Sequence, residues 1–359
     1  MASEPPRGRG SASRPAARYE PLQREPVDDG WVGDDDPAPA LRTEVTPETP
    51  RSLLVRNDSP DVPFTLSINP YRGCEHGCAY CFARPAHAYV GLSPGLDFES
   101  RLYVKTGAAA VLRRELGARN YRPSPVALGI NTDAYQPVER EWRVTRELLE
   151  VLAESAHPVS IVTKSALVER DLDLLGPMGH AGLAQVAVSL TSLDRGLSRR
   201  LEPRAAAPQR RLETIRRLTD AGVPVSVLVA PLIPVLTDGE TESLLEAAAA
   251  AGAVSADYVL LRLPREVAGL FEEWLRAHEP LKAEHVLARL REAHGGRVYD
   301  SSFGQRMRGS GAWADLLGQR FALARRRHGL DRWSGDLDCS QFRPPAPAKP
   351  ADDRQLDLF

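Results

Sequence analysis

Short apolar segments recur along the middle of the chain at intervals of roughly 30 to 40 residues, which is the spacing of strands that alternate with helices. Each segment is short enough for a buried strand and too short for a helix. The pattern predicts six strands, at 65–69, 126–131, 159–163, 185–190, 225–230 and 257–262.

Helical periodicity occupies the intervals between these segments. One predicted helix ends before Gly222, and another, over 240–251, ends before Gly252, because glycine readily adopts the backbone conformation that ends a helix. A further predicted helix has an apolar face that consists of Trp142, Leu148, Leu149 and Leu152. Six βα units predict an α/β fold, a partial (β/α)6 barrel of the TIM type. A doubly wound open sheet is an alternative that periodicity does not exclude.

Composition divides the chain into four parts. Residues 1–60 are rich in Pro, Arg, Ser, Gly and Asp and are predicted to be disordered. The partial barrel is expected over 61–264, a helical C-terminal extension over 265–335, and a flexible tail over 336–359. No apolar run approaches the roughly 18 residues of a membrane span, so we expect a cytoplasmic protein without a membrane partner.

The net charge of −2 is close to neutral, but arginine is unevenly distributed. Between residues 282 and 332 there are ten Arg and one Lys against five acidic residues. Such a segment indicates either contact with phosphates or a solvated helical cap that packs against the barrel. The same segment contains the aromatic residues Tyr299, Phe303, Trp313 and Phe321.

Three of the four cysteines lie within eight residues, and these three carry the most specific chemical signal of the chain. Cys74, Cys78 and Cys81 have C-x3-C-x2-C spacing, whereas Cys339 is distant. A [4Fe–4S] cluster bound by three thiolates keeps one iron free for a small molecule. A zinc site with His76 as fourth ligand is the alternative. Disulfides are not expected, because cysteines this close form strained loops.

The cysteine spacing, with Tyr80 before the last cysteine, resembles that of the radical S-adenosylmethionine (SAM) superfamily. The stretch 67–85 around it resembles proteins related to spore photoproduct lyase, and so do Thr132–Pro137, Thr163–Ser165 and Leu201–Arg204. The resemblance covers about residues 50–335. It implies a [4Fe–4S] cluster on the three cysteines, SAM on the open iron, an external reductant and a 5′-deoxyadenosyl radical. It identifies no catalytic side chain.

The resemblance also implies which residues contact SAM, because the unusual residues follow the predicted strands and should meet at one end of the barrel. Asn131 and Asp133 are expected to accept hydrogen bonds from the ammonium group, and Lys164 to pair with the carboxylate. Ser189 is expected on the carboxylate or the ribose. The backbones of Tyr80 and Ile233 are expected on the adenine. Each polar residue also suits a turn or a cap, which the sequence leaves open.

Two features point towards DNA. The family resemblance implies a DNA substrate, in repair or in base modification; the alternatives are RNA, protein, or a binding module without catalysis. The chain also ends in a peptide that resembles those that bacterial proteins insert into the replication sliding clamp. Its apolar side chains suit a pocket and its glutamine suits the polar rim, and it consists of Gln355, Leu356, Asp357, Leu358 and Phe359.

Overall fold

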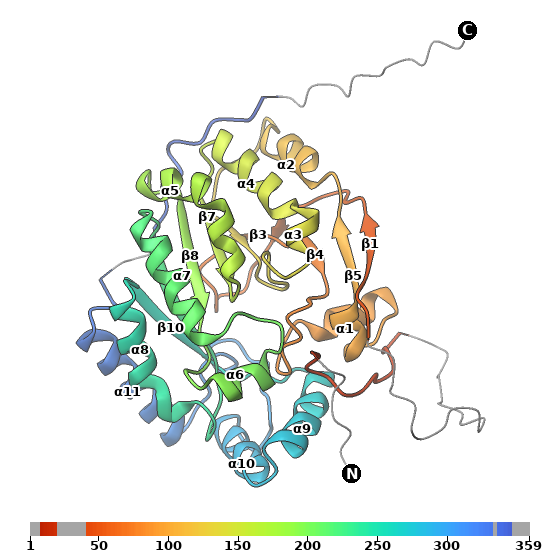
Figure 1. Cartoon of the computed structure of the whole chain (residues 1–359), viewed down its shortest axis with the longest axis vertical. Helices are drawn as coiled ribbons and strands as arrows, with labels where there is room; N and C mark the ends of the chain where they lie inside the picture. The colour runs from red at the N-terminus through yellow and green to blue at the C-terminus, as the bar shows by residue number, and fades with distance from the viewer. Residues whose placement is uncertain (1–7, 20–40, 333–335, 347–359) are drawn as a thin grey trace, which may run out of the picture.

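A seven-stranded sheet forms the centre of the computed structural model, which describes residues 8–19, 41–332 and 336–346 (Figure 1). Its strand order is β10-β9-β8-β7-β6-β3-β2. All six predicted strands are present. They are β3 (Leu66–Ile68), β6 (Val126–Leu128), β7 (Val159–Thr163), β8 (Ala184–Ser189), β9 (Val225–Leu232) and β10 (Ser255–Leu260).

These six strands are parallel and lie side by side in sequence order, whereas the edge strand β2 (Val55–Arg56) is antiparallel to β3. A doubly wound sheet reverses its strand order at a switch point, and this sheet does not, so the order agrees with barrel-type winding. Within the described residues β10 and β2 do not pair with each other, and the sheet is open.

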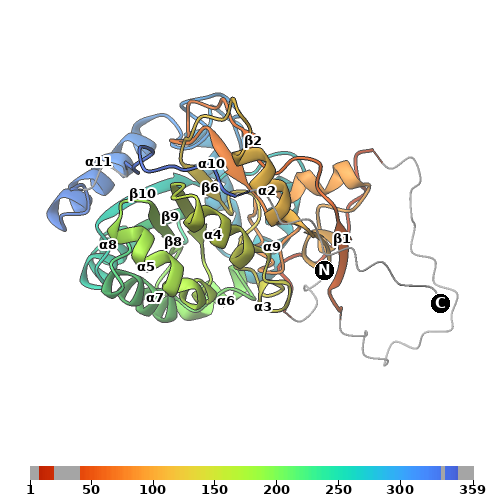
Figure 2. The same ribbon diagram turned by 90° about the horizontal axis from the view of Figure 1, so that it is seen from above.

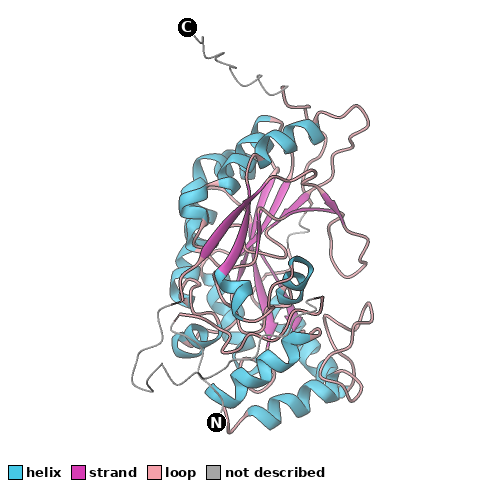
Figure 3. Cartoon of the chain, turned by 90° about the vertical axis from the view of Figure 1, so that its right-hand side faces the viewer, coloured by secondary structure: helices cyan, strands magenta, loops and turns pink. Residues whose placement is uncertain are grey.

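Helices complete the βα units and line one side of the strands (Figures 2 and 3). The connecting helices are α4 (Val144–Glu154), α5 (Leu172–His180), α7 (Pro208–Asp220) and α8 (Thr241–Ala250), with the shorter η2 (Ala166–Asp171), α6 (Arg195–Leu201) and η3 (Asp238–Glu240). Leu148, Leu149 and Leu152 face the core as predicted. Trp142 instead ends a separate helix, α3 (Glu139–Trp142), because Arg143 has a φ of 52° and breaks the helix.

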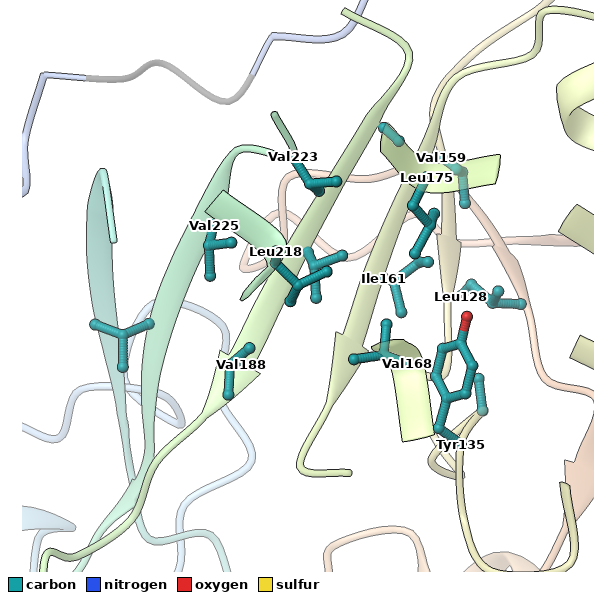
Figure 4. Packing of buried hydrophobic residues seen from close by; sticks show 14 of the residues in the cluster. Leu128, Tyr135, Val159, Ile161, Val168, Leu175, Val188, Leu218, Val223 and Val225 are labelled. Atoms are coloured by element: carbon teal, nitrogen blue, oxygen red, sulfur yellow. The ribbon is translucent and has the colours of Figure 1, made fainter. Parts of the chain in front are cut away.

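The main core lies between these helices and the sheet (Figure 4). Val159 and Ile161 on β7, and Val225 and Val227 on β9, are fully buried and contact apolar side chains of the helices. Burying each of these side chains stabilises the fold by about 1.5–3 kcal/mol relative to exposure.

A second, smaller sheet lies beside the first and supports its carboxyl end. It pairs β5 (Arg101–Lys105) with β1 (Glu44–Glu48) in parallel and with β4 (Tyr71–Arg72) in antiparallel orientation. The helices around it are η1 (Arg84–Val90), α1 (Leu96–Ser100) and α2 (Ala108–Leu116). The predicted C-terminal extension contains α9 (Glu266–His278), α10 (Ala283–Ala293) and α11 (Ala312–Arg327). Its boundary at residue 264 stays a prediction.

Two segments expected to be disordered or flexible have defined contacts where the structure describes them. Near the N-terminus, residues 9–11 are buried and 44–48 form β1. In the C-terminal tail, the Arg343 amide donates a hydrogen bond of 2.9 Å to the Ser155 carbonyl. The predicted clamp-binding peptide at 355–359 lies outside the described residues. No helix in the described ranges is both long and apolar enough to cross a bilayer.

Candidate metal and cofactor site

The cysteine loop, residues 74–81, lies between β4 and η1, where the chain leaves the carboxyl end of β3. Cys74 and Cys78 are buried and Cys81 is partly exposed, and all three thiols are free, as expected. Gly73 and Gly77 have φ values of 76° and 65°, so the loop turns at both positions in a conformation that favours glycine.

The donor geometry separates a cluster from a zinc ion. His76 turns away from the thiols, because its Nε2 lies 3.2 Å from Asp133 Oδ2 and its Nδ1 lies 3.2 Å from the Arg204 carbonyl. Among the described residues, no three His, Cys, Asp or Glu side chains are placed to hold a single metal ion. A cubane cluster takes one thiolate on each of three irons and does not need the sulfurs to meet at one point. With His76 beside Asp133 and the Arg204 carbonyl, the loop offers its three thiols alone, a donor set that fits a [4Fe–4S] cluster with one open iron better than zinc.

The turn that follows β6 holds the backbone of the cysteine loop. The Thr132 hydroxyl donates to the Tyr71 carbonyl at 2.9 Å. Gln136 is fully buried; its Nε2 donates to the Gly73 carbonyl at 3.1 Å, and its Oε1 accepts from the Glu75 amide at 2.8 Å. This turn therefore holds the backbone around the cysteine loop by hydrogen bonds that do not involve a bound ligand.

Asp133, in the same turn, joins three parts of the site. Its Oδ1 accepts from the Tyr135 amide and the Thr163 hydroxyl at 2.9 and 2.7 Å, and its Oδ2 accepts from the Lys164 amide at 2.8 Å. These three hydrogen bonds engage both carboxylate oxygens, and His76 Nε2 lies 3.2 Å from Oδ2. Burial raises the pKa of Asp133, but His76 and these hydrogen bonds outweigh burial and lower it to about 2.

A buried charge cluster lies on the other side of the loop, centred on Glu202. The Glu202 carboxylate accepts from the Tyr80 hydroxyl, from the Thr191 hydroxyl at 3.0 Å and from Arg211, and it lies 3.5 Å from Lys164 Nζ. Lys164 Nζ also donates to the Tyr80 hydroxyl at 3.2 Å. Burial raises the pKa of Glu202, but Arg211 and Lys164 outweigh burial, so the pKa lies well below its ordinary value.

A second buried ion pair supports the loop from η1 and α1. Arg84 Nη2 lies 2.5 Å from Glu99 Oε1, and both side chains are fully buried. Arg84 donates from Nε and Nη2 to the Cys78 carbonyl at 3.0 and 2.8 Å. Its Nη1 donates to the carbonyls of Pro94 and Gly95. All five N–H groups of this guanidinium thus have acceptors, as a buried arginine requires.

The residues expected to contact SAM gather around this loop, in different surroundings. Ile233 is buried in the same apolar cluster as Cys78 and Tyr80, and its amide donates to the Thr237 hydroxyl at 2.8 Å. The buried Ser189 donates from Oγ to the Ala230 carbonyl at 3.1 Å. Asn131 is exposed and lines a pocket of about 190 Å³ beside Phe82, the neighbour of Cys81.

Of the ten arginines between residues 282 and 332, all of which the structure describes, four form ion pairs, and one of these is Arg289 with Glu292 at 2.7 Å. Arg306 pairs with Asp61, and Arg308 and Arg320 pair with Asp257 and Glu242 at 2.6 and 2.8 Å. Of the aromatic residues in this segment, Phe321 is buried, Trp313 packs against the core and Phe303 is exposed. Packing against the barrel therefore accounts for Phe321 and Trp313, and Phe303 remains available to a partner.

Several residues of the site are absent from the sequence-based predictions. Glu202 falls within a motif that pointed to the family. Only the fold buries it and brings Tyr80 and Lys164 to its carboxylate. Arg84 and Gln136 also fall within stretches that resemble the family, whereas Glu99 and Arg211 are ordinary polar residues in the sequence. Only the tertiary structure shows that these four residues are buried and that their partners lie up to 90 residues away in the chain.

Comparison with known proteins agrees with this geometry. The model of the radical SAM superfamily matches residues 68–248. An uncharacterized protein of Mycobacterium tuberculosis is 43% identical over 227 residues, which cover 62% of this chain and 67% of that protein. An uncharacterized protein of Methanocaldococcus jannaschii is 27% identical over 176 residues, covering 48% of this chain and 62% of that protein.

Solved structures of spore photoproduct lyase share the fold. One, complexed with dinucleoside spore photoproduct, has a TM-score of 0.55 at 16% identity, covering 81% of this chain and 80% of that one. A variant with bound AdoMet and the same dinucleoside has a TM-score of 0.52 at 17% identity, with the same coverage. The chain therefore belongs to the radical SAM superfamily, whose enzymes bind a [4Fe–4S] cluster and SAM.

Proposed function

We propose that this chain is a radical SAM enzyme that binds a [4Fe–4S] cluster through Cys74, Cys78 and Cys81 and acts on DNA. The observation that carries the proposal is the loop itself: it has three free thiols, two of them buried, and its backbone forms hydrogen bonds with four separate segments. A loop ordered in this way loses little conformational entropy on binding a metal.

When bound, the cluster and SAM supply an electron and a 5′-deoxyadenosyl radical. The residues of this chain would bind and orient SAM. Lys164 lies at the edge of the buried charge cluster and has the compact ammonium that suits a carboxylate. Ser189 and the backbones of Tyr80 and Ile233 are proposed on the ribose and the adenine. Asn131 is proposed on the ammonium. Asp133, which already accepts three hydrogen bonds, is proposed to orient the loop instead.

Exposed aromatic side chains, among them Phe82 next to Cys81, support a nucleic-acid substrate. Arg262 stacks over Phe82 with 4.9 Å between the guanidinium carbon and the ring centroid, and Arg306 stacks over Phe303 at 4.6 Å. Aromatic rings and arginine planes are the groups on which unstacked bases bind. Among the described residues, the exposed aromatic side chains are Tyr19, Phe82, Tyr89 and Phe303, which are 59%, 38%, 65% and 59% accessible.

Anaerobic reconstitution tests the cluster assignment. We expect about four irons per chain and, after reduction, cleavage of SAM to 5′-deoxyadenosine. Cys78→Ala should lose both, whereas Cys339→Ala should keep both, because Cys339 lies in the C-terminal segment, outside the loop. Full SAM cleavage in Cys78→Ala would overturn the assignment.

Deuterium transfer tests the substrate class. Deuterated single-stranded DNA should transfer deuterium to 5′-deoxyadenosine, and Tyr89→Ala should weaken DNA binding, since base stacking contributes about 1–3 kcal/mol per base. Transfer from RNA or protein, and none from DNA, would replace DNA by that substrate class.

The C-terminal peptide is proposed to recruit the enzyme to the sliding clamp in the cytoplasm. Deleting 355–359 and measuring clamp binding by calorimetry tests this part. Unchanged affinity would remove the clamp as a partner and leave the enzymatic proposal untouched.

A further inference from the structure

We propose that residues 8–19 form a strap that positions the cysteine loop and covers it. The strap is the short red segment near α1 and α9 in Figure 1. The statement that the loop binds a cluster rests on the proposed function, whereas the contacts between strap and loop do not depend on a metal.

The strap binds Glu99 of α1, which supports the cysteine loop through its ion pair with Arg84. The amides of Gly10 and Ser11 each donate to the Glu99 carboxylate at 2.9 Å, one to each oxygen. The guanidinium of Arg9 donates to the Glu99 carbonyl at 2.6 Å, and only 5% of Arg9 is exposed. A buried carboxylate requires such donors, and Glu99 receives two of them from the strap.

Glu99 transmits this attachment to the cysteine loop. Its carboxylate also binds Arg84, and Arg84 donates two hydrogen bonds to the carbonyl of Cys78. Strap, carboxylate, guanidinium and loop backbone thus form one continuous buried network. Without the strap, Glu99 would lose two of its donors and hold Arg84 less firmly. Arg9, Gly10 and Ser11 are therefore positioning residues.

The strap also lies directly against the loop. A Cβ added to Gly10 would lie 1.7 Å from the Gly77 carbonyl oxygen and 3.2 Å from the Ala79 nitrogen. No side chain fits between these two backbones. Contact this close leaves no room for water between the strap and the loop backbone at Gly77 and Ala79.

The C-terminal end of the strap, at Arg18, attaches beside the pocket that contains Phe82 and Asn131. Arg18 pairs with Glu266 of α9 at 2.7 Å and donates to the Pro85 carbonyl at 3.0 Å. Arg18 also lines the pocket that contains Phe82 and Asn131. The strap therefore connects Glu99 of α1 with α9, and Arg18 forms part of the pocket wall.

Gly10→Ala tests the strap, with Gly269→Ala in α9 as the matched control, because a Cβ at Gly269 meets no atom within 4 Å. In the chain without metal, we expect amide hydrogen exchange over residues 74–84 to be at least about tenfold faster in Gly10→Ala and unchanged in Gly269→Ala. After reconstitution, iron release to a chelator should accelerate in Gly10→Ala alone, and the electron paramagnetic resonance spectrum of the reduced cluster should change.

A chain that lacks residues 1–16 provides a second test. A synthetic peptide of residues 6–20, added in excess, should restore slow exchange over 74–84, whereas a peptide with Gly10 replaced by alanine should not. Exchange and iron release equal to those of Gly269→Ala in both tests would overturn the strap. Failure of every variant, and of the unaltered chain, to bind iron while exchange still responds would instead contradict the cluster assignment.

Discussion

Glu202→Gln should destabilise the chain strongly, because it leaves the buried Arg211 and the partly buried Lys164 without their counterion. The Glu202 side chain is fully buried, and Arg211, which binds it, is 1% exposed. Lys164 lies 3.5 Å away on the other oxygen. Removing one partner of a buried ion pair costs about 3–5 kcal/mol, because the desolvation of the remaining charge is no longer offset. Glutamine keeps the volume, so a cavity adds nothing to this loss.

Urea unfolding of the metal-free chain, followed by circular dichroism, measures the effect. The matched control is Glu213→Gln in α7, whose side chain is 54% exposed and lies 3.7 Å from Arg210. We expect this control to change the free energy of unfolding by at most about 0.5 kcal/mol. A loss below about 1 kcal/mol for Glu202→Gln would refute the assignment of a buried charge cluster.

Three further predictions concern other parts of the fold. The pKa of Asp133 falls from 3.8 to about 2 on folding, so the ionised carboxylate stabilises the folded chain by about 2 kcal/mol. This stabilisation is complete above pH 4 and is lost as the pH falls towards 2. Urea unfolding of Asp133→Asn should therefore show a smaller loss of stability over this pH range. Gln136→Leu should leave the Glu75 amide and the Gly73 carbonyl unpaired, cost about 2 kcal/mol and speed hydrogen exchange of the loop; unchanged exchange would contradict its role. Leu148→Ala should cost about 2–5 kcal/mol without changing iron content, measured by urea unfolding and iron analysis.

The strands and the cysteine loop could be predicted because their signals are local. A short apolar run indicates a strand, and β7, whose alternate residues are buried, begins and ends where that pattern predicted. The break between α3 and α4 could not be predicted, because a positive φ at Arg143 has no signal in residue type. The packing of residues 8–19 was missed for a related reason, since their composition is that of a disordered segment.

By itself, the sequence determined the parallel α/β architecture, the family and the clustering of three cysteines as candidate cluster ligands. It could do so because periodicity and residue spacing are properties of neighbouring residues. Only the tertiary structure decided which polar groups support those cysteines. Glu202, Arg84, Gln136 and Asp133 have their effect through burial beside partners from other segments. Burial and pairing strengthen electrostatic interactions, and they arise only when distant parts of the chain come together.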